Sequence, residues 1–133
     1  MGGYGCNGGA AGAGFEYLTS SKAILEDVYP YANSNSTTTI GTCDTTDMET
    51  TDILVASWNK VESFHGTQTK AALMTGPVGI LINAATTQFN YYTSGIFDCD
   101  SSVCRTDWSS LDHAVLLVGW GVENDIEYFI LKN

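Results

Sequence analysis

A histidine that stands directly before a continuous apolar run is the feature that most constrains how this chain folds. Asp112-His113 precedes the run Ala114–Val118, and a second run of strand length spans Glu127–Leu131. The residues between the two runs, Gly119–Asp125, include glycine, asparagine and aspartate. Apolar runs of this length, bounded by such residues, predict two strands joined by a turn. A histidine at the mouth of a buried strand is a position typical of a catalytic imidazole.

Two helices are predicted ahead of these strands. Apolar residues recur at helical spacing over residues 10–20, although the glycines at positions 12 and 14 each disfavour a helix by about 1 kcal/mol relative to alanine. We expect packing to hold that helix, because small residues allow a close approach. The second helix is predicted over Thr67–Thr75, with Thr67 as its N-cap and Gly76-Pro77 ending it. His65, in the polar loop before that helix, is expected to be solvated.

The order of the remaining elements indicates the fold class. Strands are predicted at Ile53–Ala56 and Val78–Ile82, and one or two helical turns at Phe89–Tyr92. Residues 32–52 read as a loop rich in serine, threonine and asparagine, too polar for a core. Helices come first and strands follow, which is typical of an α+β fold.

The charge of the chain argues against two classes of partner. Its formal net charge is −10, with 5 Lys and Arg against 15 Asp and Glu, and this disfavours nucleic-acid backbones and anionic membrane surfaces. No apolar run reaches the roughly 18 residues of a membrane span. No basic and apolar segment of a signal peptide follows Met1. We therefore expect neither a nucleic-acid partner nor a membrane partner.

The four cysteines leave several readings open. If all are oxidised, Cys6, Cys43, Cys99 and Cys104 allow three pairings. No C-x-x-C is present, so neither a zinc ribbon nor a thioredoxin-type redox site is expected. A metal site built from Cys99, Cys104 and His113 is an alternative, but its spacing matches no common template.

Four blocks of this sequence resemble the later part of a papain-family (cathepsin-like) cysteine protease. In order, they are Gly5-Cys6-Asn7-Gly8-Gly9, Val28-Tyr29-Pro30-Tyr31, the D-H-A-V-L-L-V-G-W-G run that begins at Asp112, and Lys132-Asn133. The resemblance covers nearly the whole chain and implies part of a papain-like, two-lobe α+β fold. Residues 1–48 would be the end of the helical left lobe. Residues 49–133 would be most of the β-barrel right lobe, truncated at its C-terminal end.

The resemblance assigns two residues to catalysis. His113 corresponds to the catalytic histidine, and Asn133 to the asparagine that orients it. The chemistry suits these residue types, because an imidazolium stabilises a neighbouring thiolate and an amide oxygen can hold the second ring N–H. Without the resemblance, the two residues alone favour the structural alternative, in which His113 is a strand-edge histidine and Asn133 a turn residue.

The nucleophile of the family has no counterpart in the sequence. The C-G-S-C-W block matches nothing here, and the usual distance of 130–150 residues from cysteine to histidine places it ahead of Met1. The resemblance makes Cys6 and Cys43 disulfide cysteines with partners upstream of this chain. Cys104 stands where the family has a cysteine paired beyond Asn133, and a local Cys99–Cys104 bridge is the alternative.

The resemblance also indicates where substrate binds. The glycine at the position of Gly9 pairs with the backbone of the substrate residue second from the cleaved bond (P2), with Asn7, Gly8 and Asp112 as further contacts. A tight turn before the helix is the alternative reading of the two glycines. An apolar set falls where the family builds the P2 pocket, and it would favour leucine, valine or phenylalanine. Its members, each also readable as ordinary core, are Ala10, Ala11, Leu81, Leu111 and Ala114.

The expected function is that of a papain-like cysteine endopeptidase, which hydrolyses peptide bonds through a thioester and needs no metal or organic cofactor. This chain carries the histidine and asparagine but not the cysteine, so alone it is predicted to be inactive. Expected partners are a peptide or protein substrate and a propeptide or cystatin-like inhibitor. The setting would be lysosomal, vacuolar or secreted, with any signal peptide lying outside this chain.

Two alternatives belong to other classes of protein. The first is a truncated, non-catalytic papain-like homologue that binds peptides or inhibitors through the Gly8-Gly9 edge. The second is an unrelated secreted disulfide protein, which would require a pairing that leaves no cysteine orphaned.

Overall fold

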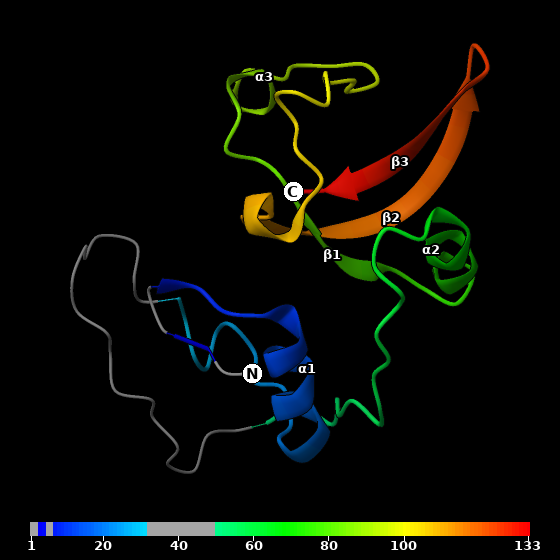
Figure 1. Cartoon of the computed structure of the whole chain (residues 1–133). Helices are drawn as coiled ribbons and strands as arrows, with labels where there is room; N and C mark the ends of the chain where they lie inside the picture. The colour runs from blue at the N-terminus through cyan, green and yellow to red at the C-terminus, as the bar shows by residue number, and fades with distance from the viewer. Residues whose placement is uncertain (1–2, 5–6, 32–49) are drawn as a thin grey trace. The chain divides into compact units, whose positions relative to one another are not determined.

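The computed structural model describes residues 3–4, 7–31 and 50–133, and the chain forms two compact units, residues 1–60 and 61–133. Each unit is described by itself (Figure 1). Helices and an antiparallel sheet are both present, so the α+β prediction is confirmed. The predicted lobe boundary after residue 48 concerns the whole two-lobe fold and stays a prediction.

The described residues of the first unit contain one α-helix. Helix α1 spans Ala11–Ser20, within the predicted range, and begins without a side-chain cap. The segment after residue 50 lies against it, since Val55 N–H donates to the Leu18 carbonyl (3.1 Å). The predicted strand Ile53–Ala56 is wrong, because no ladder forms there among the described residues. Its backbone bonds to the chain around α1, a tertiary contact that local sequence pattern does not encode.

Gly12 explains why α1 tolerates glycine. A Cβ at this position would lie 3.1 Å from Cη2 of Trp58. The Trp58 ring packs against Phe15 with centroids 6.3 Å apart, and its Nε1–H donates to Glu16 Oε2 (2.9 Å). At Gly14, in contrast, a Cβ would meet no described atom within 4 Å outside the neighbouring residues and the backbone of the helix itself. The two glycines therefore have different roles, and only the first makes room for a ring.

Substitution of Gly12 and of Gly14 by alanine gives a matched test of the packing against Trp58. We expect Gly14→Ala to stabilise the first unit by about 0.5–1 kcal/mol through helix propensity alone. Gly12→Ala gains the same propensity but forces the Trp58 ring to move by a few tenths of an ångström, so it is expected to stabilise the unit less than Gly14→Ala does. Urea unfolding followed by tryptophan fluorescence measures both values. Equal stabilisation by the two variants would contradict the packing role of Gly12.

The second unit contains a three-stranded antiparallel sheet in the order β1-β2-β3. Strand β1 spans Val78–Ile82, β2 spans His113–Glu123 and β3 spans Ile126–Lys132. The predicted strand Val78–Ile82 is confirmed. The turn between β2 and β3 is shorter than the predicted Gly119–Asp125, because the strands continue to a two-residue turn at Asn124-Asp125. Both turn residues have positive φ (51° and 62°), which these side chains tolerate in tight hairpins.

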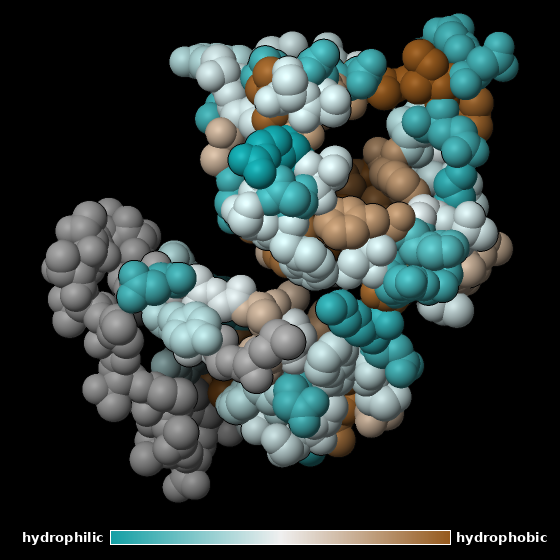
Figure 2. Space-filling view, viewed as in Figure 1, coloured by the Kyte–Doolittle hydropathy of each residue, from teal (hydrophilic) through white to brown (hydrophobic). Residues whose placement is uncertain are grey.

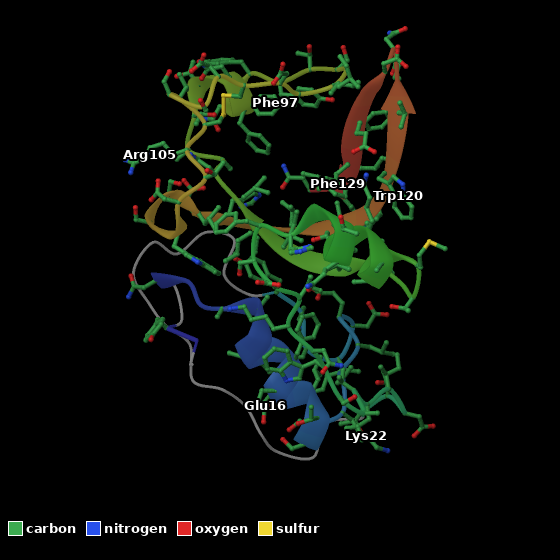
Figure 3. All side chains as sticks on the ribbon, turned by 45° about the vertical axis from the view of Figure 1, so that its right-hand side comes forward. Glu16, Lys22, Phe97, Arg105, Trp120 and Phe129 are labelled. Atoms are coloured by element: carbon green, nitrogen blue, oxygen red, sulfur yellow. A yellow bond between two sulfur atoms is a disulfide. The ribbon has the colours of Figure 1, made fainter. Side chains whose placement is uncertain are left out.

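The core of this sheet is small and much of its apolar surface is exposed. Val115 and Leu117 are 7% and 1% exposed, and they are the buried hydrophobic residues of the described chain. Trp120 and Phe129 are register partners across the hairpin and are 38% and 41% exposed (Figure 3). Hydrophobic residues are visible at the surface and in the hollow of this unit (Figure 2). Exposed apolar area on this scale favours association with further polypeptide.

The helices of the second unit begin at side-chain caps. Helix α2 spans Gly66–Leu73, and its N-cap is His65, whose Nδ1 accepts a hydrogen bond from Gln68 N–H (3.4 Å). The predicted cap Thr67 is therefore wrong, although His65 is exposed as expected. Helix α3 spans Thr87–Asn90 and begins at Thr86, so the helical turn predicted at Phe89–Tyr92 starts earlier.

A short 3₁₀ helix, η2, spans Trp108–Ser110 and begins at Asp107, whose carboxylate accepts from the backbone of Ser109. Within the described ranges, no helix has the length and apolar character needed to cross a bilayer.

Candidate active site

The β2–β3 hairpin brings His113 and Asn133 together. His113 is the first residue of β2, and its register partner in β1 is Ile82. Strand β3 returns along β2 until Lys132 pairs with Leu116, and Asn133 follows directly. Figure 1 shows the C-terminus close to the start of β2. Although the two residues are 20 positions apart, His113 Nε2 and Asn133 Oδ1 lie 2.8 Å apart.

This contact sets the tautomer of the imidazole. The amide oxygen of Asn133 can only accept, so Nε2 of His113 carries the donated hydrogen. A neutral ring in this tautomer has Nδ1 as its basic nitrogen, and among the described residues Nδ1 makes no hydrogen bond. The half-buried ring also meets Phe89 in a T-shaped contact, with centroids 6.4 Å apart. The imidazole is thus oriented from two directions, with its basic nitrogen available.

Asp112 organises the backbone beside the histidine. Its Oδ1 accepts from Ala84 N–H (2.8 Å) and its Oδ2 from Ala85 N–H (3.1 Å). Its own N–H donates to the Ile82 carbonyl (3.1 Å). Hydrogen bonds to a carboxylate are stronger than those between neutral groups. The loop after β1 is therefore fastened to the residue that precedes His113.

A pocket of about 540 Å³ opens beside the two residues. It is lined by Ala84, Ala85, Phe89, Asn90, Asp112, His113 and Asn133. Asp112, His113 and Asn133 were predicted as site residues, whereas the four residues from positions 84 to 90 were not. Alanines after a strand carry no chemical signal, and the aromatic residue was recognised only as part of a helical turn. The carboxylate of Asp112 places Ala84 and Ala85 at the pocket, and no local pattern encodes that contact.

The substrate-contacting residues predicted in the second unit are only partly brought together. Leu81 and Ala114 are register partners and therefore lie on the same face of the sheet. The neighbouring pair, Ile82 and His113, points to the opposite face. Leu111 is half-buried and follows η2 as its C-cap.

The other predicted contacts, Asn7 to Ala11, belong to the first unit. Gly9 forms an isolated antiparallel bridge with Gly3, and Gly8 has φ of 91°. The Gly8 carbonyl accepts from Tyr4 N–H (2.8 Å), so the glycines form a tight turn before α1. The turn reading of Gly8 and Gly9 is thus supported, and it is compatible with a role in binding.

The structure pairs two of the four cysteines. Cys99 and Cys104 are joined by a disulfide, the alternative to a partner for Cys104 beyond the chain. The metal site drawn from Cys99, Cys104 and His113 is excluded, because both sulfurs are bonded to each other and neither is a thiolate. Cys6 and Cys43 lie outside the described residues, so their predicted pairings stay predictions.

Two carboxylates near this disulfide are stabilised in their ionised form. The Ser102 hydroxyl and backbone N–H lower the pKa of Asp100. The Ser109 hydroxyl, assisted by the Arg105 guanidinium, lowers the pKa of Asp107. Since both pKa values fall on folding, the stabilisation is present above the unfolded pKa and is lost as the pH falls through the folded one. The loop between α3 and η2 is thus held more firmly at neutral pH than in strong acid.

Comparison with known families agrees with this geometry. All of residues 1–133 match the family model described as papain family cysteine protease. The chain belongs to the papain family of cysteine proteases. The family predicted from the sequence is confirmed, as is the partial papain-like α+β fold.

Curated relatives of this papain-family chain include proteases of several plants. It is 35% identical to cysteine proteinase RD21A of Arabidopsis thaliana, an alignment that covers 97% of this chain and 26% of that protein. It is 30% identical to zingipain-2 of Zingiber officinale, over 98% of this chain and 54% of that protein. The chain therefore spans between a quarter and about half of the length of these relatives.

Solved structures show the same partial coverage. The bromelain protease of Ananas comosus, in complex with the E64 inhibitor, matches with a TM-score of 0.79 and 30% identity. That match covers 98% of this papain-family chain and 56% of the bromelain chain. The Carica candamarcensis cysteine protease CMS1MS2, in complex with E-64, matches with a TM-score of 0.75 and 26% identity.

Proposed function

We propose that this chain supplies the histidine and the asparagine of a Cys-His-Asn endopeptidase that hydrolyses peptide bonds. The observation that carries the proposal is the 2.8 Å contact between His113 Nε2 and Asn133 Oδ1 at the rim of a pocket. Membership of a cysteine protease family makes a thiol the chemical partner of the free ring nitrogen. None of the four cysteines of this sequence has that role in the proposal, so the thiol comes from outside these 133 residues.

The chemistry follows from the orientation of the ring. Nδ1 of His113 takes the proton of the thiol, and the resulting imidazolium stabilises the thiolate. The thiolate attacks the scissile carbonyl, and the imidazolium then gives its proton to the departing amine, which leaves a thioester. A water molecule, deprotonated by the neutral ring, hydrolyses that thioester. Throughout, Asn133 holds the ring so that Nδ1 faces the reacting atoms.

The proposal extends to binding and setting. Asn7, Gly8 and Gly9 contact the substrate backbone, and Asp112 shapes the pocket through the loop that it fastens. The apolar residues Ala10, Ala11, Leu81, Leu111 and Ala114 receive an apolar P2 side chain. A propeptide or a cystatin-like inhibitor binds to the same residues, and the enzyme works in a lysosomal, vacuolar or secreted setting. These assignments rest on family membership and on the matching sequence blocks.

A direct test uses the complete enzyme that the proposal implies, in which this chain is joined to the segment that carries the cysteine. We expect it to hydrolyse a fluorogenic Phe-Arg peptide and to be stopped by E-64. A well-folded complete protein that cleaves no peptide and is not labelled by E-64 would overturn the proposal.

Asn133 offers a sharper test of the same site. We expect Asn133→Ala in the complete enzyme to lower kcat by about 10- to 100-fold, because one hydrogen bond that orients a charged ring contributes about 1.5–3 kcal/mol. The KM should change by less than about threefold, because the amide holds the ring and not the substrate. Steady-state kinetics measures both constants. Asn90→Ala is the matched control, since that amide lines the pocket without contacting the ring, and its kcat should exceed that of Asn133→Ala.

A further inference from the structure

The loop between α3 and η2, which contains the disulfide, makes one tertiary contact before the bridge and another after it. Cys99 and Cys104 are five positions apart and close the centre of this loop. Phe97 lies just before the bridge and Arg105 just after it (Figure 3). Phe97 contacts Phe89, which lines the pocket beside His113, and Arg105 contacts Asn83, the residue before the pocket-lining Ala84.

The contact before the bridge is aromatic. The Phe97 ring meets Phe89 edge-to-face with centroids 5.7 Å apart, and it meets Tyr92 in the same manner at 5.9 Å. Phe89 lines the pocket and packs against the imidazole of His113. The position of Phe97 therefore bears on how firmly the ring of the histidine is held on this side.

The contact after the bridge is polar. The Arg105 carbonyl accepts from Asn83 Nδ2 (3.3 Å) and from Ser110 Oγ (3.0 Å). Asn83 is followed by Ala84, which lines the pocket and donates its N–H to Asp112. The backbone after the bridge is thus tied to the loop that forms the other wall of the pocket.

We propose that the Cys99–Cys104 disulfide is a redox-sensitive brace of the pocket that holds His113. In the oxidised state the bridge fixes Phe97 and Arg105 relative to one another, so both walls are held together. In the reduced state the two contacts become independent, since six residues without a cross-link sample many more conformations. The effect on catalysis rests on the proposed function, whereas the structural effect does not.

The reductant is a small dithiol that reaches the loop from solvent. The two cysteines are half-buried, and the residues between them are exposed. A dithiol such as dithiothreitol attacks one sulfur, and the mixed disulfide then closes to the cyclic oxidised reagent. The bond between Cys99 and Cys104 breaks, each sulfur gains one hydrogen, and the dithiol loses two electrons and two protons. The carboxylates of Asp98 and Asp100 beside the bridge would repel an anionic thiol such as glutathione.

The test is backbone and side-chain NMR on the full chain, before and after reduction. Cys6→Ser with Cys43→Ser is the background, so that the dithiol acts on this bridge alone. We expect reduction to speed amide exchange of Ala84 and Ala85 by about tenfold or more and to shift the ring resonances of His113. Amides of Ala71 and Ala72 in α2 should keep their rates, and reoxidation should restore the original spectrum.

Three outcomes would overturn the proposal that the disulfide braces the pocket. The first is a pocket whose exchange rates and histidine resonances do not change on reduction. The second is loss of protection throughout the sheet and α2, which would make the bridge a support of the whole unit. The third is uniformly fast exchange already in the oxidised chain. Cys99→Ser with Cys104→Ser should reproduce the reduced spectrum, and if that variant fails to fold, reduction of the parent chain still decides.

This experiment separates the brace from the proposed function. Its readout is the structure of the pocket, and it involves no peptide hydrolysis. A complete enzyme without peptidase activity would contradict the proposed function but not the role of the disulfide. A pocket that does not change on reduction would contradict the role of the disulfide but not the proposed function.

Discussion

The purified chain is expected to hydrolyse no peptide bond by itself. Incubated with a fluorogenic Phe-Arg peptide, it should give no turnover that E-64 inhibits, whereas the complete enzyme at the same concentration should give clear turnover. The reason is chemical, because an oriented imidazole without a thiol cannot form the thioester on which the mechanism depends. The sulfurs of Cys99 and Cys104 are bonded to each other and supply no nucleophile.

The remaining cysteines make the result decisive. Turnover by the chain alone would mean that Cys6 or Cys43 acts as the nucleophile, in conflict with their predicted place in disulfides. Cys6→Ser and Cys43→Ser, made separately, would then identify which of the two is responsible. Reduction should not create activity either, because the Cys99 and Cys104 thiols it releases belong to the loop between α3 and η2 and do not line the pocket beside His113.

The pairing of His113 with Asn133 could be predicted because two local patterns and one turn determine it. The apolar runs define both strands, and Asn124-Asp125 tolerates the positive φ that a tight hairpin requires. Once the strands pair in antiparallel register, β3 returns toward the start of β2. Lys132 pairs with Leu116, and the side chain of the next residue, Asn133, reaches the His113 ring. The turn is shorter than predicted, but this difference does not change which residues lie at the open end of the hairpin.

Features that depend on contacts between distant segments could not be predicted in this way. Ile53–Ala56 has the composition of a strand, but its backbone bonds toward α1 and finds no strand partner among the described residues. Ala84 and Ala85 became pocket residues only through the carboxylate of Asp112.

The predicted cap of α2 is wrong, whereas the pairing of Cys99 with Cys104 is one of the alternatives that the sequence left open. Thr67 is a better N-cap by residue preference than His65, but the cap lies two residues earlier than that preference indicates. Four cysteines allow three pairings, and sequence alone does not choose among them. Cys99 and Cys104 pair because the folded loop between α3 and η2 brings their side chains together.

The largest effect of a single substitution is expected at His113. In the complete enzyme, His113→Ala should lower kcat/KM by about 10⁴-fold or more, because the base that activates the thiol and the acid that protonates the leaving amine are lost together. The KM should change little, since the ring takes part in proton transfer and does not bind the substrate. Stopped and steady-state assays with the Phe-Arg peptide measure the loss.

The sequence provides its own control for this substitution. Its second histidine, His65, caps α2 through Nδ1 and has no place in the pocket. His65→Ala should therefore reduce stability by about 1 kcal/mol while kcat/KM stays within about threefold of the parent value. Added imidazole should restore part of the activity of His113→Ala, because it can enter the space left by the ring, and it should have no such effect on His65→Ala. Equal losses in the two variants would show that histidine removal acts through folding, and the assignment of His113 as the catalytic base would then be wrong.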